Sequence, residues 1–336
     1  MSVASAAGAS PRAHVSGGRR WVPALAFGVA CAAQGAPAAD PLAWLQRAAE
    51  AARSASYSGV FVHTNGERTS TVRITHLSVG GEEHERIEPL DGPPHEIVRR
   101  NDEMLCYYPD AQTVRLDRRV SARFFPAILE ATPAAIAASY DVKLGASERV
   151  LGFDCQWIRL EPKDAMRFAQ RVCSETSTGL VIRAKTLNEQ KQVIEQYTFT
   201  ELKLGREVAR GDVKSLFEAR VKRWITDARP REEAKSVITG WQVTNAPSGF
   251  QKVTELRRTL PGRTQPVSQL IYTDGLATLS VFVEPNAGPA RTAEASNEDG
   301  TTTFFVRPMG ESLVTVLGDV PLATARQVGR SVARKP

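Results

Sequence analysis

The sequence has 336 residues and a formal net charge of +6, with 43 lysines and arginines against 37 acidic residues. This mildly basic balance permits contact with anionic lipid, but the basic residues form no dense run of the kind that binds nucleic acid. The length has room for two domains of ordinary size.

The first 38 residues have the features of a secretory signal peptide. Two arginines precede an apolar stretch over residues 21–33, and APA at residues 36–38 is a small-x-small cleavage pattern. The apolar stretch is shorter than the roughly 20 residues of a membrane-spanning helix, and no later segment approaches that length. We therefore predict that residues 1–38 are removed and that the remaining chain is exported and soluble.

Two other interpretations of this leader have weaker support. Arg19 and Arg20 resemble a twin-arginine signal, but the rest of that pattern is missing after them. The sequence GVAC ending at Cys31 resembles a lipoprotein cleavage box, although Gly28 stands where a larger aliphatic residue is expected. Ordinary export is preferred, and lipidation of Cys31 is the minority interpretation.

The mature chain is predicted to begin with a helix and to continue into a large antiparallel sheet. Asp40 can cap the helix, Pro41 suits its first position, and the helix is expected to bury Leu42, Leu45, Ala49 and Ala52 on one face. Closely spaced β-prone runs separated by turn residues then indicate a meander. These runs lie at 57–64, 69–79, 82–88, 95–100, 103–108 and 113–117.

A helical stretch is expected to interrupt this sheet. Residues 124–140 are rich in alanine and contain two prolines, and β-prone sequence resumes at residue 140. The sheet is predicted to be complete by about Leu204. A strongly charged stretch over residues 206–237 then reads as a linker or a solvated helix.

The rest of the chain, residues 238–336, predicts a second and smaller domain. It contains several short β-prone runs, and Asp274-Gly275 between two of them is the strongest hairpin signal in the chain. A closing helix is expected over residues 321–333. The predicted fold class is therefore α+β, with a sheet-rich domain over residues 39–205, a linker over residues 206–237 and the small domain.

Cys155 and Cys173 are predicted to form a structural disulfide. In a hairpin centred on Asp164 the two cysteines lie directly opposite each other, and Glu161 faces Arg167 as a pair of opposite charge. Opposed cysteines can come close enough to bond, and an exported protein meets an oxidising environment. A redox pair would more typically be Cys-x-x-Cys, and a metal site would need further ligands. Cys106 is expected to be a buried strand thiol.

The sequence contains no recognisable catalytic or cofactor motif. The mature histidines have no metal-ligand spacing, and the chain lacks a nucleophile elbow, a P-loop and a dinucleotide-binding glycine motif. We therefore expect no catalytic residues, no metal and no cofactor, and an exported two-domain binding protein. An envelope hydrolase is a distant alternative.

Four segments together resemble the MucB/RseB family of periplasmic regulators of the envelope-stress sigma factor. They are SYSGVFVH, RLEPKDAMRFAQRVCSETSTGLVIRA, LIYTDGLATLSVFVE and VTVLGDVPLATARQVGRSV, in this order along the chain. The resemblance spans most of the mature chain and both predicted domains. It implies that the first domain is a half-open antiparallel β-barrel of the kind found in the lipoprotein carriers LolA and LolB, with helices in its concavity.

The resemblance also implies a function. The protein would be periplasmic, would bind the periplasmic part of an inner-membrane anti-sigma factor similar to RseA or MucA, and would shield it from the site-one protease. Lipopolysaccharide or mislocalised lipoprotein would release it. The alternative is a carrier that ferries lipoproteins or lipids across the periplasm. The oligomeric state is left open, a homo-oligomer included.

Two groups of candidate binding residues accompany this interpretation, and ordinary core packing is the alternative for both. A pocket for an acyl chain is expected near the helical interruption, lined by Phe124, Phe125, Ile128 and Leu129. A surface for the anti-sigma partner is expected on the small domain, around Trp241, Phe250 and Tyr272.

Overall fold

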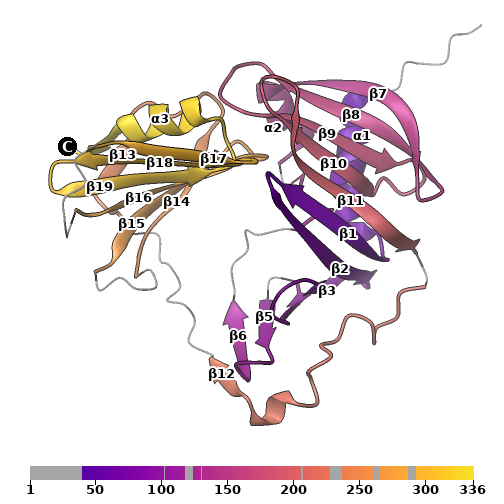
Figure 1. The fold of residues 1–336 in the computed structure, drawn as a ribbon. Coiled ribbons are helices and arrows are strands. Elements are labelled where there is room, and N and C mark those ends of the chain that lie inside the picture. Colours follow the sequence, from indigo (N-terminus) through magenta and orange to yellow (C-terminus); the bar gives the residue numbers. More distant parts are fainter. Residues whose placement is uncertain are drawn as a thin grey trace, which may run out of the picture. The chain divides into compact units, whose positions relative to one another are not determined.

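The computed structural model describes residues 40–101, 103–117, 124–129, 131–205, 207–227, 237–259, 265–286 and 293–336. The predicted signal peptide, with Cys31, lies outside these residues. The described chain forms a large sheet of 12 strands, a small sheet of six strands and a two-stranded sheet (Figure 1). None of its helices has the length and apolar character needed to cross a membrane.

The large sheet follows the chain closely, because most of its strands pair with their neighbours in sequence as antiparallel hairpins. Across the sheet the strand order is β12-β6-β5-β4-β3-β2-β1-β11-β10-β9-β8-β7, so β12 and β7 are its two edges. Its strands are β1 (Tyr57–Asn65), β2 (Arg68–Val79), β3 (Glu82–Pro89), β4 (Glu96–Arg100), β5 (Glu103–Tyr108), β6 (Thr113–Asp117), β7 (Tyr140–Val150), β8 (Phe153–Pro162), β9 (Ala169–Glu175), β10 (Val181–Leu187), β11 (Val193–Leu204) and β12 (Ile225–Asp227).

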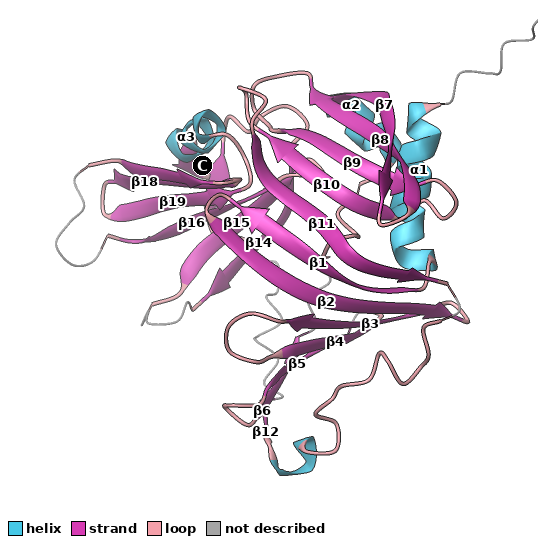
Figure 2. Ribbon diagram, turned by 45° about the vertical axis from the view of Figure 1, so that its right-hand side comes forward, coloured by secondary structure: helices cyan, strands magenta, loops and turns pink. Residues whose placement is uncertain are grey.

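Helix α1 (Pro41–Ser54) packs against the large sheet and begins as the sequence predicts. Asp40 accepts a hydrogen bond from the Leu42 amide, and Pro41 occupies the first helical turn. Leu45 and Ala52 are buried as expected, whereas Leu42 is 37% exposed. Figure 2 shows α1 on the same side of the sheet as the short helix α2. Apolar residues of both helices and of the sheet form one core, which contains the fully buried Leu45, Ile136 and Ile158.

The predicted helical stretch over residues 124–140 contains a helix only in its last part. Helix α2 spans Pro133–Ser139, and the Thr132 hydroxyl caps it by accepting a hydrogen bond from the Ala135 amide. The described residues before it are irregular. Alanine content favours a helix here, but Pro126 has no amide hydrogen to donate to a helical turn. The structure therefore confirms a helix at this place, but the helix is shorter than predicted.

The β8–β9 hairpin contains the predicted disulfide in a different register. Cys155 faces Glu175 and Trp157 faces Cys173, so the two cysteines are diagonal neighbours with Cα atoms 5.5 Å apart. The prediction that they face each other directly is wrong by two residues, and Glu161 does not face Arg167. The reason is that Arg167 leaves the ladder: it lies before β9 and binds Asp164 within the connecting loop.

The charged stretch after β11 returns to the large sheet. Val208 and Val213 pack on Leu77, and the buried Glu96 accepts a hydrogen bond of 2.5 Å from the Ser215 hydroxyl. Burial raises the pKa of Glu96 above its usual value. Within residues 207–227 the only helix is the 3-10 turn η1 (Val221–Arg223), so a solvated helix is the wrong prediction for this part. Strand β12 then pairs with β6 in parallel.

The small sheet has the strand order β14-β15-β16-β19-β18-β17. The predicted hairpin at Asp274-Gly275 is present, because β15 and β16 pair on either side of it. Helix α3 (Leu322–Arg330) packs on one face, over a core of buried valines, leucines and Phe305. The strands are β14 (Gln251–Arg258), β15 (Val267–Thr273), β16 (Thr278–Pro285), β17 (Ala295–Asp299), β18 (Thr302–Met309) and β19 (Ser312–Gly318), and the separate pair is β13 (Trp241–Val243) with β20 (Val332–Arg334).

These elements confirm the predicted fold class: an open antiparallel sheet with two helices, followed by a smaller sheet with one helix. The exact domain boundaries at residues 205 and 238 stay a prediction. The structure adds that part of the predicted linker belongs to the large sheet.

Candidate functional site at the junction of the two sheets

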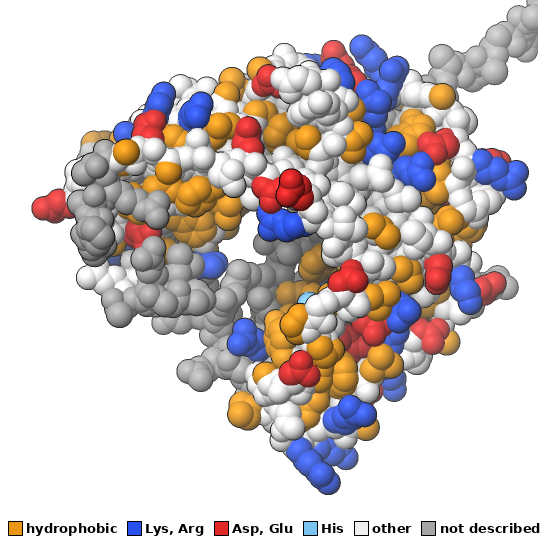
Figure 3. Space-filling view, in the orientation of Figure 1, with side chains coloured by type: hydrophobic (Ala, Val, Ile, Leu, Met, Phe, Trp, Pro, Cys, Tyr) orange, Lys and Arg blue, Asp and Glu red, His pale blue; other side chains and the backbone are white. Residues whose placement is uncertain are grey.

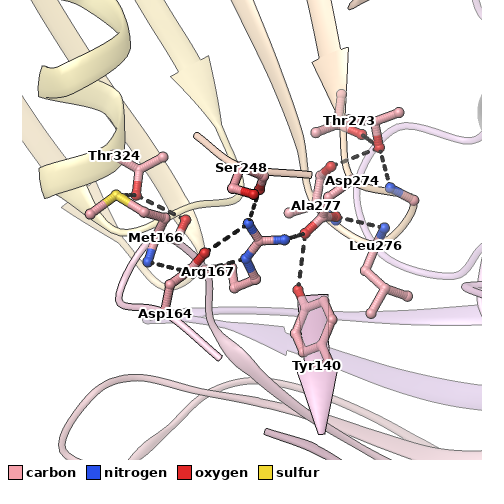
Figure 4. Close-up of polar contacts among 12 residues, drawn as sticks. Tyr140, Asp164, Met166, Arg167, Ser248, Thr273, Asp274, Leu276, Ala277 and Thr324 are labelled. Carbon is pink, nitrogen blue, oxygen red and sulfur yellow. Dashed lines mark hydrogen bonds and ion pairs between the residues drawn. The ribbon is translucent and has the colours of Figure 1, made fainter. Parts of the chain in front are cut away.

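Arg167 is the centre of the contacts between the large and small sheets, which we call the junction. Its side chain is fully buried, and its Nε and Nη2 atoms donate to the two carboxylate oxygens of Asp164 at 3.0 and 3.1 Å. A planar guanidinium suits such a two-point bond. Figure 4 shows that its remaining donors point toward the small sheet.

Asp274 supplies the second carboxylate for Arg167. Its Oδ2 atom lies 2.7 Å from Arg167 Nη1, and both side chains have no exposed surface. Its Oδ1 atom accepts hydrogen bonds from the amides of Leu276 and Ala277 at 2.9 and 2.8 Å, which is the usual role of an aspartate in a turn. The same residue therefore shapes the β15–β16 hairpin and binds the large sheet.

Two aromatic side chains enclose this ion pair. The Tyr140 hydroxyl donates to Asp274 Oδ2 at 3.3 Å, and the Arg167 guanidinium lies 5.7 Å from the Tyr140 ring and 5.1 Å from the Phe250 ring. Burial, and next the charge of Asp274, raise the pKa of Tyr140 above its usual value, so its hydroxyl keeps its proton. Arg167 also donates to the backbone oxygen of Ser248. The pair is thus shielded from water and held by hydrogen bonds on both of its side chains.

A second group of polar contacts joins two hairpin turns across the junction. Asn65, at the end of β1, accepts from the Thr301 amide at 2.8 Å and donates to the Thr301 hydroxyl at 3.2 Å. Arg68 forms an ion pair with Asp299 beside them. In addition, the Thr324 hydroxyl of α3 donates to the Met166 carbonyl at 2.9 Å, as Figure 4 shows.

Glycines at two of these turns allow the backbones to approach each other. Gly275 has φ +94° and Gly300 has φ +61°, values that favour glycine. A Cβ atom on Gly275 would overlap Ala131, and one on Gly300 would overlap Asn65. Both side chains would collide across the junction, so the close fit depends on glycine at these two positions.

A cavity of about 250 Å³ lies at the junction and carries negative charge. Its lining includes Glu195 of β11 and Asp319 after β19, with apolar walls that include Ile128 and Leu129. None of the described residues that line it is a lysine, an arginine or a histidine. Glu195 is held in place by His63 Nε2 at 3.0 Å, the Tyr197 hydroxyl at 3.1 Å and the Thr186 hydroxyl at 3.1 Å. This cavity is therefore a poor place for an anionic group.

Asp319 is expected to make the stability of the protein depend on pH. Asp319 lines the cavity and keeps exposed surface, but the protein around its carboxylate, and next the nearby charge of Glu195, raise its pKa from 3.8 to about 6. The folded protein binds this proton more tightly than the unfolded chain, so the contribution of Asp319 to the free energy of unfolding rises as the pH falls from about 6 to about 4.

We therefore expect Asp319→Asn to raise the melting temperature at pH 7, with an advantage that shrinks as the pH falls toward 4. Thermal unfolding at several pH values measures this difference. Glu311→Gln, which removes an exposed carboxylate from the turn before β19, is the matched control and should change little. An advantage of Asp319→Asn that stays constant over this range would contradict the assignment.

A larger cleft of about 430 Å³ lies between strands β4 and β5 and the returning residues 210–218. Four cationic side chains line it, those of Arg99, Arg100, Arg210 and Lys214, together with apolar residues such as Leu105. Two glutamates also contribute. Figure 3 shows hydrophobic side chains gathered over the part of the large sheet where β5 and β6 lie. Arg99 and Arg100 form ion pairs with Glu85 and Glu82, so the cleft combines the cations of Arg210 and Lys214 with apolar surface.

The predicted acyl-pocket residues lie close together without forming a single pocket wall. Phe125 is 2% exposed and packs against Phe61 and Phe199, and Phe124 lies half-buried beneath Arg99. Ile128 and Leu129 line the junction cavity. A role for these four residues in acyl binding stays a prediction.

The predicted partner-binding residues lie in or against the core of the small sheet. Phe250 and Tyr272 are 7% and 6% exposed, and Trp241 packs against the same core beneath Arg334. Their role in partner binding also stays a prediction. Phe250 does contribute to the junction, through its contact with Arg167.

Sequence reasoning did not identify the Arg167–Asp274 pair. The two residues are separated by 107 positions, and each has a local explanation, as a strand arginine and as a turn aspartate. The only signal in the sequence was that each of the two hairpins has a charged residue among apolar neighbours. Cys106, on β5, is half-buried rather than fully buried.

The structure defines a protein of two main sheets, which are joined by polar contacts at the junction and have a cavity and a cleft beside them. Comparison with known proteins identifies the family of this protein. Residues 40–217 match the MucB/RseB N-terminal domain, and residues 235–333 match the MucB/RseB C-terminal domain. The chain belongs to the MucB/RseB family.

The similarity extends over nearly the whole chain. The sigma factor AlgU regulatory protein MucB of Pseudomonas aeruginosa is 31% identical over 313 residues, which cover 92% of this chain and 95% of that protein. MucB in the solved MucA/MucB complex of Pseudomonas aeruginosa is 30% identical, with a TM-score of 0.73 over 89% of this chain and 100% of that one. A crystal structure of MucB is 28% identical, with a TM-score of 0.62 over 90% of this chain and 100% of that one.

Proposed function

We propose that this protein is a periplasmic regulator that binds the periplasmic segment of a membrane-spanning anti-sigma factor, shields it from the site-one protease, and releases it when lipopolysaccharide or mislocalised lipoprotein binds. The observation that carries this proposal is the match of both halves of the chain to the two domains of one regulatory family. A related MucB has been solved in complex with MucA, which supports the choice of partner.

The basic cleft supports the lipid part of the proposal. Its volume of about 430 Å³ falls within the usual range of roughly 300–1,000 Å³ for small-molecule sites. Arg210 and Lys214 suit phosphate groups, and the apolar residues of the cleft suit hydrocarbon. The junction cavity is smaller and carries two carboxylates, so an anionic amphiphile should prefer the cleft. We therefore place the lipid head group beside Arg210 and Lys214.

Release of the partner by lipid requires that the two ligands favour different arrangements of the protein. A ligand shifts such an equilibrium only by its difference in affinity for the two arrangements. The coupling is reciprocal, so lipid must weaken partner binding by the same factor by which the partner weakens lipid binding. A lipid carrier would need no such coupling, and the match of the second half of the chain to a regulatory family favours the regulator.

Residues 39–336 are expected to bind the purified periplasmic segment of the organism's own MucA-like protein and to slow its cleavage by the site-one protease. Pull-down and a cleavage time course measure the two effects. Added lipopolysaccharide should restore cleavage, whereas a neutral detergent below its micelle concentration should not. Failure of the intact mature protein to bind the segment would remove the proposal.

A further inference from the structure

We propose that the Arg167–Asp274 pair is a latch that closes the junction and thereby sets the arrangement of the two sheets that binds the anti-sigma partner. The proposal rests on the function proposed above. Arg167 and Asp274 would be positioning residues, because both are fully buried and neither has surface with which to touch a partner.

The first argument is the division of the bonds between the two sheets. Asp164 holds Arg167 from the same loop, and the turn amides of Leu276 and Ala277 hold Asp274. Each sheet therefore has its half of the latch in place, and the bond of 2.7 Å joins the two halves. Opening the junction separates two buried charges, and closing it restores a bond whose geometry both sides already favour.

The second argument is that the latch is one of several contacts where the surfaces of the two sheets fit closely together. The turn contacts of Asn65 with Thr301 lie away from Arg167 but join the same two sheets. Gly275 and Gly300 allow backbone approach at both places, where a side chain would collide. The carboxylates of Glu195 and Asp319 act against these contacts, because they repel each other across the cavity. The junction thus holds attractive and repulsive contacts, a balance that a ligand can shift.

The third argument comes from the two MucB structures. This chain is more similar to MucB in the MucA/MucB complex than to the other MucB structure, with TM-scores of 0.73 and 0.62 at nearly equal identity and coverage. The two MucB structures therefore differ from each other. The closed junction of this protein therefore occurs in an arrangement of the two sheets that is more similar to MucB in the complex than to the other MucB structure.

The test compares Asp274→Asn with the wild-type mature protein in two measurements. Small-angle X-ray scattering reports whether the junction opens, and titration with the purified periplasmic segment of the MucA-like protein reports the affinity. An asparagine keeps the acceptor for the turn amides but removes the charge that Arg167 needs. We expect a larger radius of gyration and an affinity lower by about ten-fold or more, because apparent affinity falls with the fraction of competent molecules.

Two further variants complete the test. Arg167→Lys keeps the charge but loses the two-point bond to Asp164, so its affinity should lie between those of the wild type and Asp274→Asn; it replaces Asp274→Asn if that variant does not fold. Glu148→Gln removes an ion pair with Arg183 inside the large sheet and is the control, with unchanged scattering and affinity.

The outcomes separate the latch from the function on which it rests. An Asp274→Asn protein with unchanged scattering overturns the latch. Opening without loss of affinity overturns the positioning role. Failure of the wild type to bind the segment overturns the proposed function and with it the positioning role, while the scattering comparison still decides whether the pair closes the junction.

Discussion

Replacing Arg167 by methionine is expected to lower the free energy of unfolding by about 3–5 kcal/mol, the usual cost of removing one partner of a buried ion pair. The replacement leaves the fully buried Asp274 carboxylate without its cation, and Asp164 without its two-point bond. Urea unfolding followed by circular dichroism measures the change. Separate transitions of the two sheets would be fitted individually, since a two-domain chain need not unfold in one step.

Two comparisons make this expectation specific. Lys191→Met removes an exposed ion pair with Glu161 and should cost no more than about 1 kcal/mol. The double variant Arg167→Met with Asp274→Asn should be less destabilised than the sum of its single changes, because the second change removes the stranded charge. A cost for Arg167→Met as small as that of Lys191→Met would show that the pair contributes little.

Loss of the Cys155–Cys173 disulfide is the second change expected to have a large effect. The bond closes a loop with a sequence separation of 18, and in the chain-entropy account a loop of about 15 residues is worth about 3 kcal/mol. Both cysteines are fully buried in the core of the large sheet, so replacement by alanine adds a small packing loss. The double variant Cys155→Ala with Cys173→Ala should therefore unfold at a clearly lower urea concentration.

Cys106 provides the matched control, because it lies in the same sheet and carries no disulfide. Cys106→Ala should cost less than about 1 kcal/mol, as is usual for a partly exposed position. Non-reducing digestion and mass spectrometry should show the linked Cys155 and Cys173 peptides in the exported wild type. Equal stability of the two variants, or separate thiols at Cys155 and Cys173, would contradict the assignment.

Local signals in the sequence predicted local structure well. The cap at Asp40, the proline after it and the hairpin residues Asp274-Gly275 act over a few neighbouring residues, and the structure has a helix and a hairpin at these places. The alternation of β-prone runs with turn residues likewise predicted the large antiparallel sheet. The disulfide partners were also correct, because diagonal and directly opposed cysteines on adjacent strands both come within bonding reach.

The errors arose where distant residues compete with local rules. The β8–β9 register is shifted because Arg167 binds Asp164 and Asp274 instead of facing Glu161 across the ladder. The charged stretch after β11 packs on the large sheet because Val208 and Val213 find an apolar partner in Leu77, which lies more than 100 residues earlier. Neither partner can be identified from neighbours in sequence, and the junction depends on several such pairs.

The central claim is that this chain is a regulator that holds an anti-sigma factor, and a calorimetric titration tests it most directly. Residues 39–336 would be titrated with the purified periplasmic segment of the organism's own MucA-like protein, with and without lipopolysaccharide. The account predicts saturable binding that lipopolysaccharide weakens. Absence of binding, or binding that lipopolysaccharide leaves unchanged, would contradict it.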